Sequence, residues 1–148
     1  GAQELGREER GAEAKLMVRL ETISINNKTK SKLPSLPFLD MKNFVLGKKY
    51  ELSVLVSGEK TSRDLNKKHR NKNYTPDILS FPLEENSGEI ILTPKAVTRK
   101  AKLFGLSEKN MYDFLYIHGL LHLKGHEHSA KMDEEEYRIA KKFGIKIS

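Results

Sequence analysis

The 148-residue sequence contains no cysteine, which excludes disulfides and thiolate metal ligands. Any metal ion must therefore be held by histidine, aspartate or glutamate side chains. No apolar run approaches the roughly 18–20 residues that a membrane span needs, and no apolar segment near the start resembles a secretory signal. Charged residues make up 32% of the chain and hydrophobic residues 37%. These features indicate a soluble protein and favour a cytoplasmic location.

The length suffices for one compact domain with its own core, and not for two. Residues 1–16 (GAQELGREERGAEAKL) lack the apolar patterning that follows, and we interpret them as a cloning remnant or a disordered extension. Residues 17–148 are predicted to form a single domain. The net charge of +7 makes nucleic acid a plausible partner, because basic side chains that contact phosphates release counterions.

Hydrophobic periodicity and capping residues predict the element order βαβαββααα. This order indicates an α+β domain, with one mixed sheet of about four strands packed against about five helices. Thr61 or Ser62 is expected to cap the second helix, Thr93 the third and Ser107 the fourth. The predicted strands are 18–25, 50–56, 78–83 and 89–92, and the predicted helices are 36–46, 61–69, 94–104, 107–123 and one from about 129.

Four of the five histidines lie within residues 118–128, and three of them have the spacing of a metal site. His118 and His122, four residues apart on a helix, project from one face with Cβ atoms about 5–6 Å apart. Gly125 can end that helix in a left-handed turn, so that the chain folds back and presents His128 as a third ligand. Three protein ligands leave the fourth position of zinc open, which is typical of catalytic sites.

One histidine on an apolar stripe is usually a core residue with a hydrogen-bonding partner, but three close together are hard to satisfy without an ion. The skeleton H-x-x-x-H-x-x-G-x-x-H is that of metzincin proteases, so the helix is predicted to be a metzincin-like zinc-site helix. Those proteases carry glutamate after the first histidine as general base, and Gly119 stands there instead. His126 and Glu127 flank the third ligand and could orient it or a bound water.

Two separate motifs resemble the YbeY family, bacterial ribosomal RNA maturation factors described as metal-dependent endoribonucleases. Residues 118–128 resemble the family signature H-G-x-L-H-L-x-G-y-D-H. Residues 65–70 followed by 77–82 are similar to its L-N-x-x-y-R … T-D-V-L-S-F-p block, and 88–90 resemble its G-D-I step. The likeness covers most of the chain from Met17 onwards.

This sequence departs from the family pattern at several positions. Thr75-Pro76 stands where the family usually has Pro-Thr, and Asn73 replaces a common aspartate. Glu89 and Glu127 each replace an aspartate. The transposition is expected to reshape a turn and to leave the metal ligands in place.

The resemblance implies an α+β fold with one zinc ion, or another divalent transition metal, on His118, His122 and His128. It also implies a functional arginine in the cleft, here Arg70. The implied activity is cleavage of single-stranded RNA, in maturation of small-subunit ribosomal RNA and in ribosome quality control. The implied partners are ribosomal RNA and the ribosome or its small subunit, with no membrane and no nucleotide cofactor.

The residues support a phosphodiester cleavage in which Arg70 offsets charge on the phosphate. Glu127, His126 and Asp77 are candidates for the general base, and we assign Glu127 as the catalytic partner of Arg70. Either water or the RNA 2′-hydroxyl can serve as the nucleophile. Arg63 and Lys67 share a helical face with Arg70 for tracking the RNA backbone. Tyr74 and Phe81 are expected near the cleft, Tyr74 as a candidate platform for stacking bases and Phe81 as a core residue rather than a platform.

Two other functions stay open at this point. The histidine skeleton permits a metalloprotease, although Gly119 argues against one. A ribosome assembly factor with little catalysis of its own is the other alternative, with the metal serving mainly to hold the fold.

Overall fold

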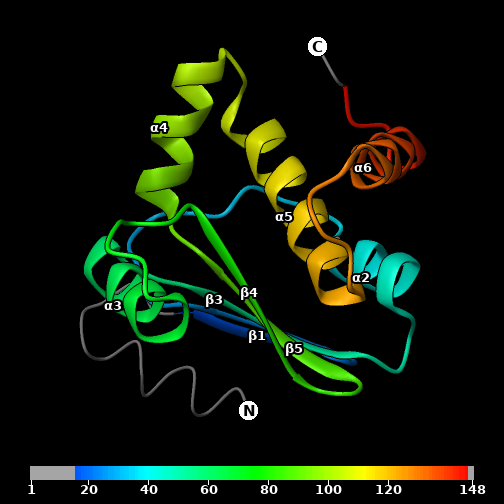
Figure 1. Ribbon diagram of the computed structural model, residues 1–148, viewed down its shortest axis with the longest axis horizontal. Coiled ribbons are helices and arrows are strands. Elements are labelled where there is room, and N and C mark those ends of the chain that lie inside the picture. The colour runs from blue at the N-terminus through cyan, green and yellow to red at the C-terminus, as the bar shows by residue number, and fades with distance from the viewer. Residues whose placement is uncertain (1–15, 147–148) are drawn as a thin grey trace.

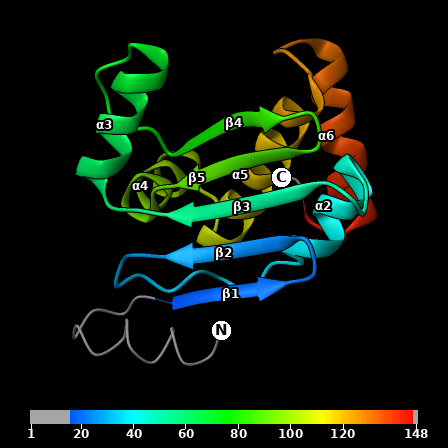
Figure 2. The same cartoon turned by 90° about the horizontal axis from the view of Figure 1, so that it is seen from below.

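The computed structural model describes residues 16–146, which form one mixed sheet with helices packed against it (Figures 1 and 2). Apart from Leu16, the segment interpreted as a remnant or an extension lies outside the described residues. The strands are β1 (Leu16–Leu20), β2 (Ile23–Asn27), β3 (Glu51–Val56), β4 (Ile78–Glu84) and β5 (Ser87–Leu92). The helices are α2 (Phe38–Leu46), α3 (Glu59–Arg70), α4 (Pro94–Phe104), α5 (Glu108–Lys124) and α6 (Ala130–Lys142).

The sheet has the strand order β1-β2-β3-β5-β4. The three central strands β2, β3 and β5 run parallel, and the edge strands β1 and β4 are antiparallel to their neighbours. The prediction of an α+β domain with a mixed sheet is confirmed, but the sheet has five strands where about four were expected.

The extra strand arises because the predicted strand 18–25 is a hairpin. Leu20 pairs with Ile23, and the two residues between them form the turn, with Glu21 in the left-handed region at φ 50°. Lys42 is buried beneath this turn and donates to Thr22 Oγ1 at 2.6 Å and to the carbonyl of Gly47 at 3.1 Å. A long-range contact from α2 therefore supports a turn that has none of the usual Asn-Gly chemistry.

The prediction that Thr61 or Ser62 caps the second helix is wrong. That helix, α3, begins at Glu59, and Ser62 is buried between strand ends, where its Oγ lies 2.5 Å from Ser57 Oγ. Thr93 does precede α4 as predicted, but its hydroxyl donates to Ser62 Oγ at 2.7 Å and does not cap the helix. Both hydroxyls are used to join α3 to the ends of β3 and β5. Ser107 does cap α5, as predicted.

Helix α5 lies at the centre of the helical layer and contacts β4, β5, α2, α4 and α6. It lies close against the sheet at Gly119, where an added Cβ would lie 2.8 Å from Ser80 Oγ and 2.9 Å from Ile78 Cδ1. Nearly one turn earlier on the helix, Tyr116 is fully buried and donates to the carbonyl of Phe38, the first residue of α2, at 2.7 Å. The helix is thereby fixed between sheet and α2.

A bilayer-spanning helix needs about 20 predominantly apolar residues. None of the helices within residues 16–146 combines that length with that apolar character.

Replacing Gly119 with glutamate is expected to lower the free energy of unfolding by about 3 kcal/mol or more, because its long side chain would be forced into a contact that has no room even for a Cβ, and its charge would be placed against Ile78 and Ile90. Gly119→Ala should cost much less, since the atoms that its Cβ meets are side-chain ends that can rotate. Urea denaturation measures both changes.

The matched control is Gly58→Ser at the start of α3, where a Cβ meets nothing within 4 Å and serine is a favoured N-cap residue. It should leave stability unchanged or slightly higher. A Gly119→Glu protein as stable as the wild type would contradict the close helix–sheet contact.

Candidate metal centre

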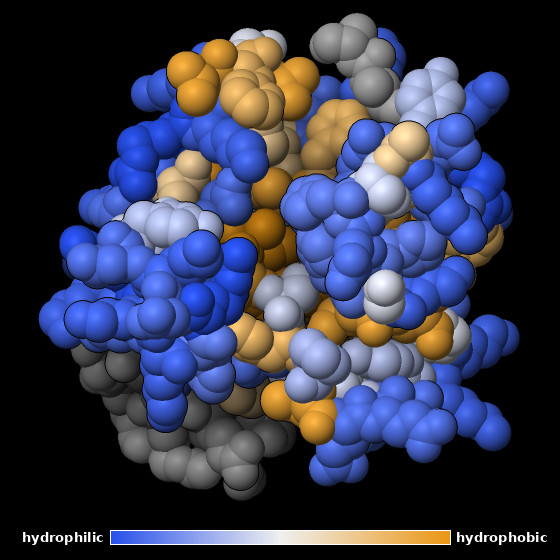
Figure 3. Space-filling view, viewed as in Figure 1, coloured by the Kyte–Doolittle hydropathy of each residue, from blue (hydrophilic) through white to orange (hydrophobic). Residues whose placement is uncertain are grey.

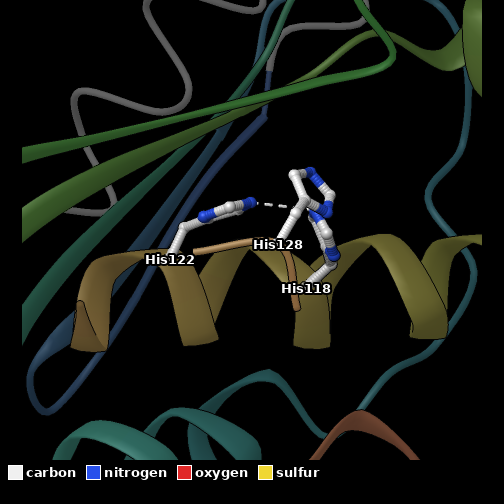
Figure 4. Close-up of side chains that lie close together, drawn as sticks. All are labelled: His118, His122 and His128. Carbon is white, nitrogen blue, oxygen red and sulfur yellow. Dashed lines mark hydrogen bonds between the residues drawn. The ribbon is translucent and has the colours of Figure 1, made fainter. Parts of the chain in front are cut away.

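The three predicted histidines meet over one face of α5 (Figure 4). His118 and His122 point to the same side of the helix, and their Nε2 atoms lie 2.9 Å apart. His128 reaches over them from the segment after the helix, and one ligand nitrogen of each ring lies within 4.8 Å of the others. The i, i+4 pair and the returning third histidine are therefore placed as the spacing predicted.

Gly125 makes this return possible. It has φ 109°, a left-handed conformation that favours glycine, and its N–H donates to the carbonyl of His122 at 3.0 Å. The next N–H, that of His126, donates to the carbonyl of Leu121 at 3.0 Å. These two bonds complete a Schellman-type ending, which turns the chain back before Ser129 caps α6.

The Nδ1 atoms of the two helical histidines are held by groups that lie outside the cluster. A carboxylate oxygen of Glu136, on α6, hydrogen-bonds His118 Nδ1, and the backbone carbonyl of His126 lies 3.0 Å from His122 Nδ1. A carboxylate or carbonyl oxygen only accepts, so the proton of each neutral ring is on Nδ1. Both Nε2 atoms then present lone pairs to the space between the rings.

This arrangement fits a cation. Two lone pairs that face each other at 2.9 Å repel unless a cation or a proton lies between them. Burial, and then the neighbouring His118, lower the pKa of His122 below its usual value, which disfavours the proton. Imidazole nitrogens whose other nitrogen donates to an oxygen are the usual ligands of Zn²⁺ and similar transition metals.

The histidines lie in the wall of a cleft of about 780 Å³ between α5, α4, β4 and the segment after α3. The space-filling view shows a hollow here, with hydrophobic residues in its floor and hydrophilic residues on either side (Figure 3). One part of the wall is apolar, and we call it the apolar arm: Phe104, Leu106, Met111, Phe114 and Leu115. The remaining lining residues are Arg70, Tyr74, Pro76, Asp77, Ile78, Leu79, Ser80, Lys100, His118, His122, His128 and Glu136.

Of the other residues singled out in the sequence, some line this cleft and others do not. Arg70 and Tyr74 are exposed and line it. Asp77 lines it too, but one carboxylate oxygen accepts from the Ile78 N–H and the other pairs with Lys100 at 2.8 Å. Asp77 is therefore committed to contacts within the fold.

Glu127 and Phe81 are not among the described residues that line the cleft. Glu127 is exposed on the segment between α5 and α6. Phe81 contacts His69, with ring centroids 4.6 Å apart and ring planes tilted by 45°, and it is half-buried, so it belongs neither to the cleft lining nor to the buried core in which it was expected. The alternation of β4 places Phe81 on the face opposite Ser80, which faces α5.

Sequence reasoning missed Glu136, Lys100 and Phe104. Glu136 and Lys100 are charged residues on the polar faces of α6 and α4, and only the packing of those helices brings them to the cleft. Phe104 stands at the end of α4, where nothing in the sequence distinguishes it from a core residue.

Fold and site together define an α+β protein with an open three-histidine centre in the wall of a deep cleft. The family model described as "Endoribonuclease YbeY" matches residues 17–144, and the chain belongs to this family. The predicted resemblance is confirmed, and with it the enzyme class, a hydrolase that cleaves RNA.

Curated relatives are similar along most of their length. "Endoribonuclease YbeY" of Sulfurimonas denitrificans is 38% identical over 102 residues, which cover 64% of this chain and 73% of that protein. The protein of the same name from Pelagibacter ubique is 34% identical over 126 residues, covering 76% and 82%. A solution structure of a Thermotoga maritima protein superposes with a TM-score of 0.54 at 26% identity, covering 72% of this chain and 78% of the other.

We expect Glu136→Gln to weaken zinc binding by about 10–100-fold, because the amide does not supply the charged acceptor that orients His118. Competition titration with a chromogenic chelator measures this affinity directly. Glu135→Gln is the matched control, since Glu135 pairs with Arg138 at 2.7 Å. Equal affinities for the two variants would show that the Glu136 contact does not support the metal.

Proposed function

We propose that this protein is a metal-dependent endoribonuclease that cleaves single-stranded RNA in the maturation of small-subunit ribosomal RNA. His118, His122 and His128 hold one divalent transition metal, with zinc as the first choice for three imidazole ligands. The observation that carries the proposal is the pair of inward-facing Nε2 atoms, 2.9 Å apart, in the wall of a cleft large enough for a nucleotide chain.

A bound ion of this kind supplies Lewis acidity toward a phosphoryl oxygen and lowers the pKa of water. The side chains of the protein hold the ion and position the substrate. Glu136 and the His126 carbonyl fix the tautomer and orientation of the two helical ligands. His128, the most exposed of the three, leaves the centre accessible from the cleft.

Arg70 is proposed to bind the phosphate. No hydrogen bond or ion pair within residues 16–146 engages its guanidinium, which is exposed at the cleft wall. A guanidinium free of protein partners can offer two parallel N–H donors to phosphate oxygens. Lys100, by contrast, is already paired with Asp77.

The general base that accepts the proton of the nucleophile stays a prediction. Asp77 is engaged by Lys100 and Glu136 by His118, so neither carboxylate is free. Glu127 is free of such contacts among the described residues, but it lies outside the cleft lining. Either water or the RNA 2′-hydroxyl would have to give up a proton to such an acceptor, and attack by the 2′-hydroxyl would restrict cleavage to RNA.

The packing around Gly119 argues against the alternative that the protein is a metalloprotease. A glutamate here would point into the contact with β4, where even a Cβ lies within 3 Å of Ser80 and Ile78. The carboxylate needed by that mechanism therefore has no place beside His118. Ribosome association, a role in ribosome quality control and a cytoplasmic location are parts of the proposal that follow from ribosomal RNA as the substrate.

We expect the zinc-loaded protein to cleave a labelled single-stranded RNA, and expect chelator or His122→Ala to abolish cleavage. Gel electrophoresis of the products, with mass spectrometry of their ends, also distinguishes 2′-hydroxyl attack, which leaves a cyclic phosphate. Cleavage that persists in both controls would contradict the metal site. Absence of cleavage in the loaded wild type would favour an assembly factor.

Arg70→Ala should retain zinc with unchanged affinity and reduce the cleavage rate by about 100-fold or more, because charge on the phosphate is no longer offset. Lys68→Ala is the matched control, since Lys68 lies on the same helix outside the cleft lining. Single-turnover rates measured beside zinc titrations separate chemistry from metal binding. Equal rates for both variants would make Arg70 an ordinary surface charge.

A further inference from the structure

The apolar arm extends from the metal centre along the same face of α5. Phe114 lies one turn before His118, and Met111 lies nearly two turns before it, so their Cα atoms are about 6 and 10 Å away along the axis. All three residues line the cleft. An RNA chain whose phosphate lies at the histidines therefore has neighbouring nucleotides within reach of the arm.

Phe104 forms the outer wall of this arm and is 59% exposed although it lines the cleft. Lys100 Nζ lies 5.8 Å from the centre of its ring, at a distance typical of a cation–π contact. A large aromatic side chain that is open to solvent inside a cleft buries little surface for the fold. The part of its ring that Lys100 does not cover is available to another flat group.

The charges around the arm select the kind of occupant. Of the charged side chains that line the described cleft, Lys100 pairs with Asp77 and Glu136 hydrogen-bonds His118. Arg70 is left as the cation without a partner within residues 16–146, and the chain carries a net charge of +7. An aromatic ring and an unpaired arginine in one cleft match a ligand with flat apolar faces and a negative backbone, which describes single-stranded nucleic acid. An apolar peptide has no negative backbone to match this arginine.

We propose that the apolar arm is a subsite for one unpaired nucleobase of the RNA, which stacks on Phe104 and is covered by Phe114 and Leu106. The inference rests on the proposed function and deepens it, since it gives a physical origin for single-strand preference. A base inside a duplex has both faces covered by its neighbours and cannot enter the arm. When the same RNA is unpaired, one of its bases can present a free face to the arm.

The test is a binding measurement in chelator, where cleavage is blocked. Fluorescence anisotropy follows a fluorescein-labelled ten-nucleotide RNA, single-stranded or paired with its complement, binding to the full chain. Phe104→Ala should weaken single-strand binding by about 5–100-fold, the range for loss of one base–aromatic stack, and should leave duplex binding unchanged. Phe104→Tyr should restore single-strand binding.

Leu103→Ala is the matched control, because Leu103 precedes Phe104, is 80% exposed and does not line the cleft. It should change binding by less than twofold. The inference is overturned if both alanine variants bind alike, or if Phe104→Ala weakens single-strand and duplex binding equally.

The same samples keep the inference separate from the proposed function. A wild type that binds single-stranded RNA through Phe104, but does not cleave it when loaded with zinc, supports the subsite and overturns the nuclease proposal. A wild type that cleaves normally with Phe104→Ala binding intact overturns the subsite alone. A wild type that binds no single-stranded RNA in chelator overturns the subsite, and the cleavage assay with zinc decides the nuclease proposal separately.

Discussion

The contact between α5 and β4 at Gly119 is the constraint on which the site depends. With no side chain at this position, the helix lies against Ser80 and Ile78 of the edge strand, and Tyr116 joins the same helix to α2 through a buried hydrogen bond. A helix held by both contacts presents His118 and His122 from a rigid support. The same contact removes the space in which a protease would place its carboxylate. Gly119 therefore decides both how α5 packs on the sheet and which general base can stand beside His118.

The rest of the metal centre follows from how the chain leaves α5. Gly125 ends the helix with a left-handed residue, Ser129 starts α6, and the short segment between them brings His128 over its two partners. Packing of α6 on α5 then places Glu136 against His118. Ligands and their main supporting carboxylate thus come from one continuous stretch, and the sheet supplies the opposite wall of the cleft.

Local signals explain which parts of this structure the sequence could predict. The i, i+4 histidines, the glycine after them and the Ser107 cap depend on neighbours a few residues away, and each was found where expected. The hairpin at Glu21 was missed because apolar and polar residues alternate on both sides of the turn. The one available signal is that the apolar positions shift from Val18 and Leu20 to Ile23 and Ile25, which breaks the period of two.

Long-range contacts explain the remainder. Ser62 and Thr93 have the composition of helix caps, but their hydroxyls bond each other across the end of the sheet. Glu136, Lys100 and Phe104 reach the cleft only through the packing of α6 and α4. Phe81 was expected in the core, but strand alternation turns it to the face of the sheet opposite Ser80, where it contacts His69. The sequence pattern of a single helix or strand does not show which of its residues will reach the cleft.

The most direct test of the account is a crystal structure of the zinc-loaded protein with anomalous data collected at the zinc edge. The account predicts one ion bound by nitrogens of His118, His122 and His128, with a non-protein ligand in the remaining position toward the cleft. An ion closed off by a fourth protein ligand such as His126 or Glu127, or no ion at these histidines, would contradict it.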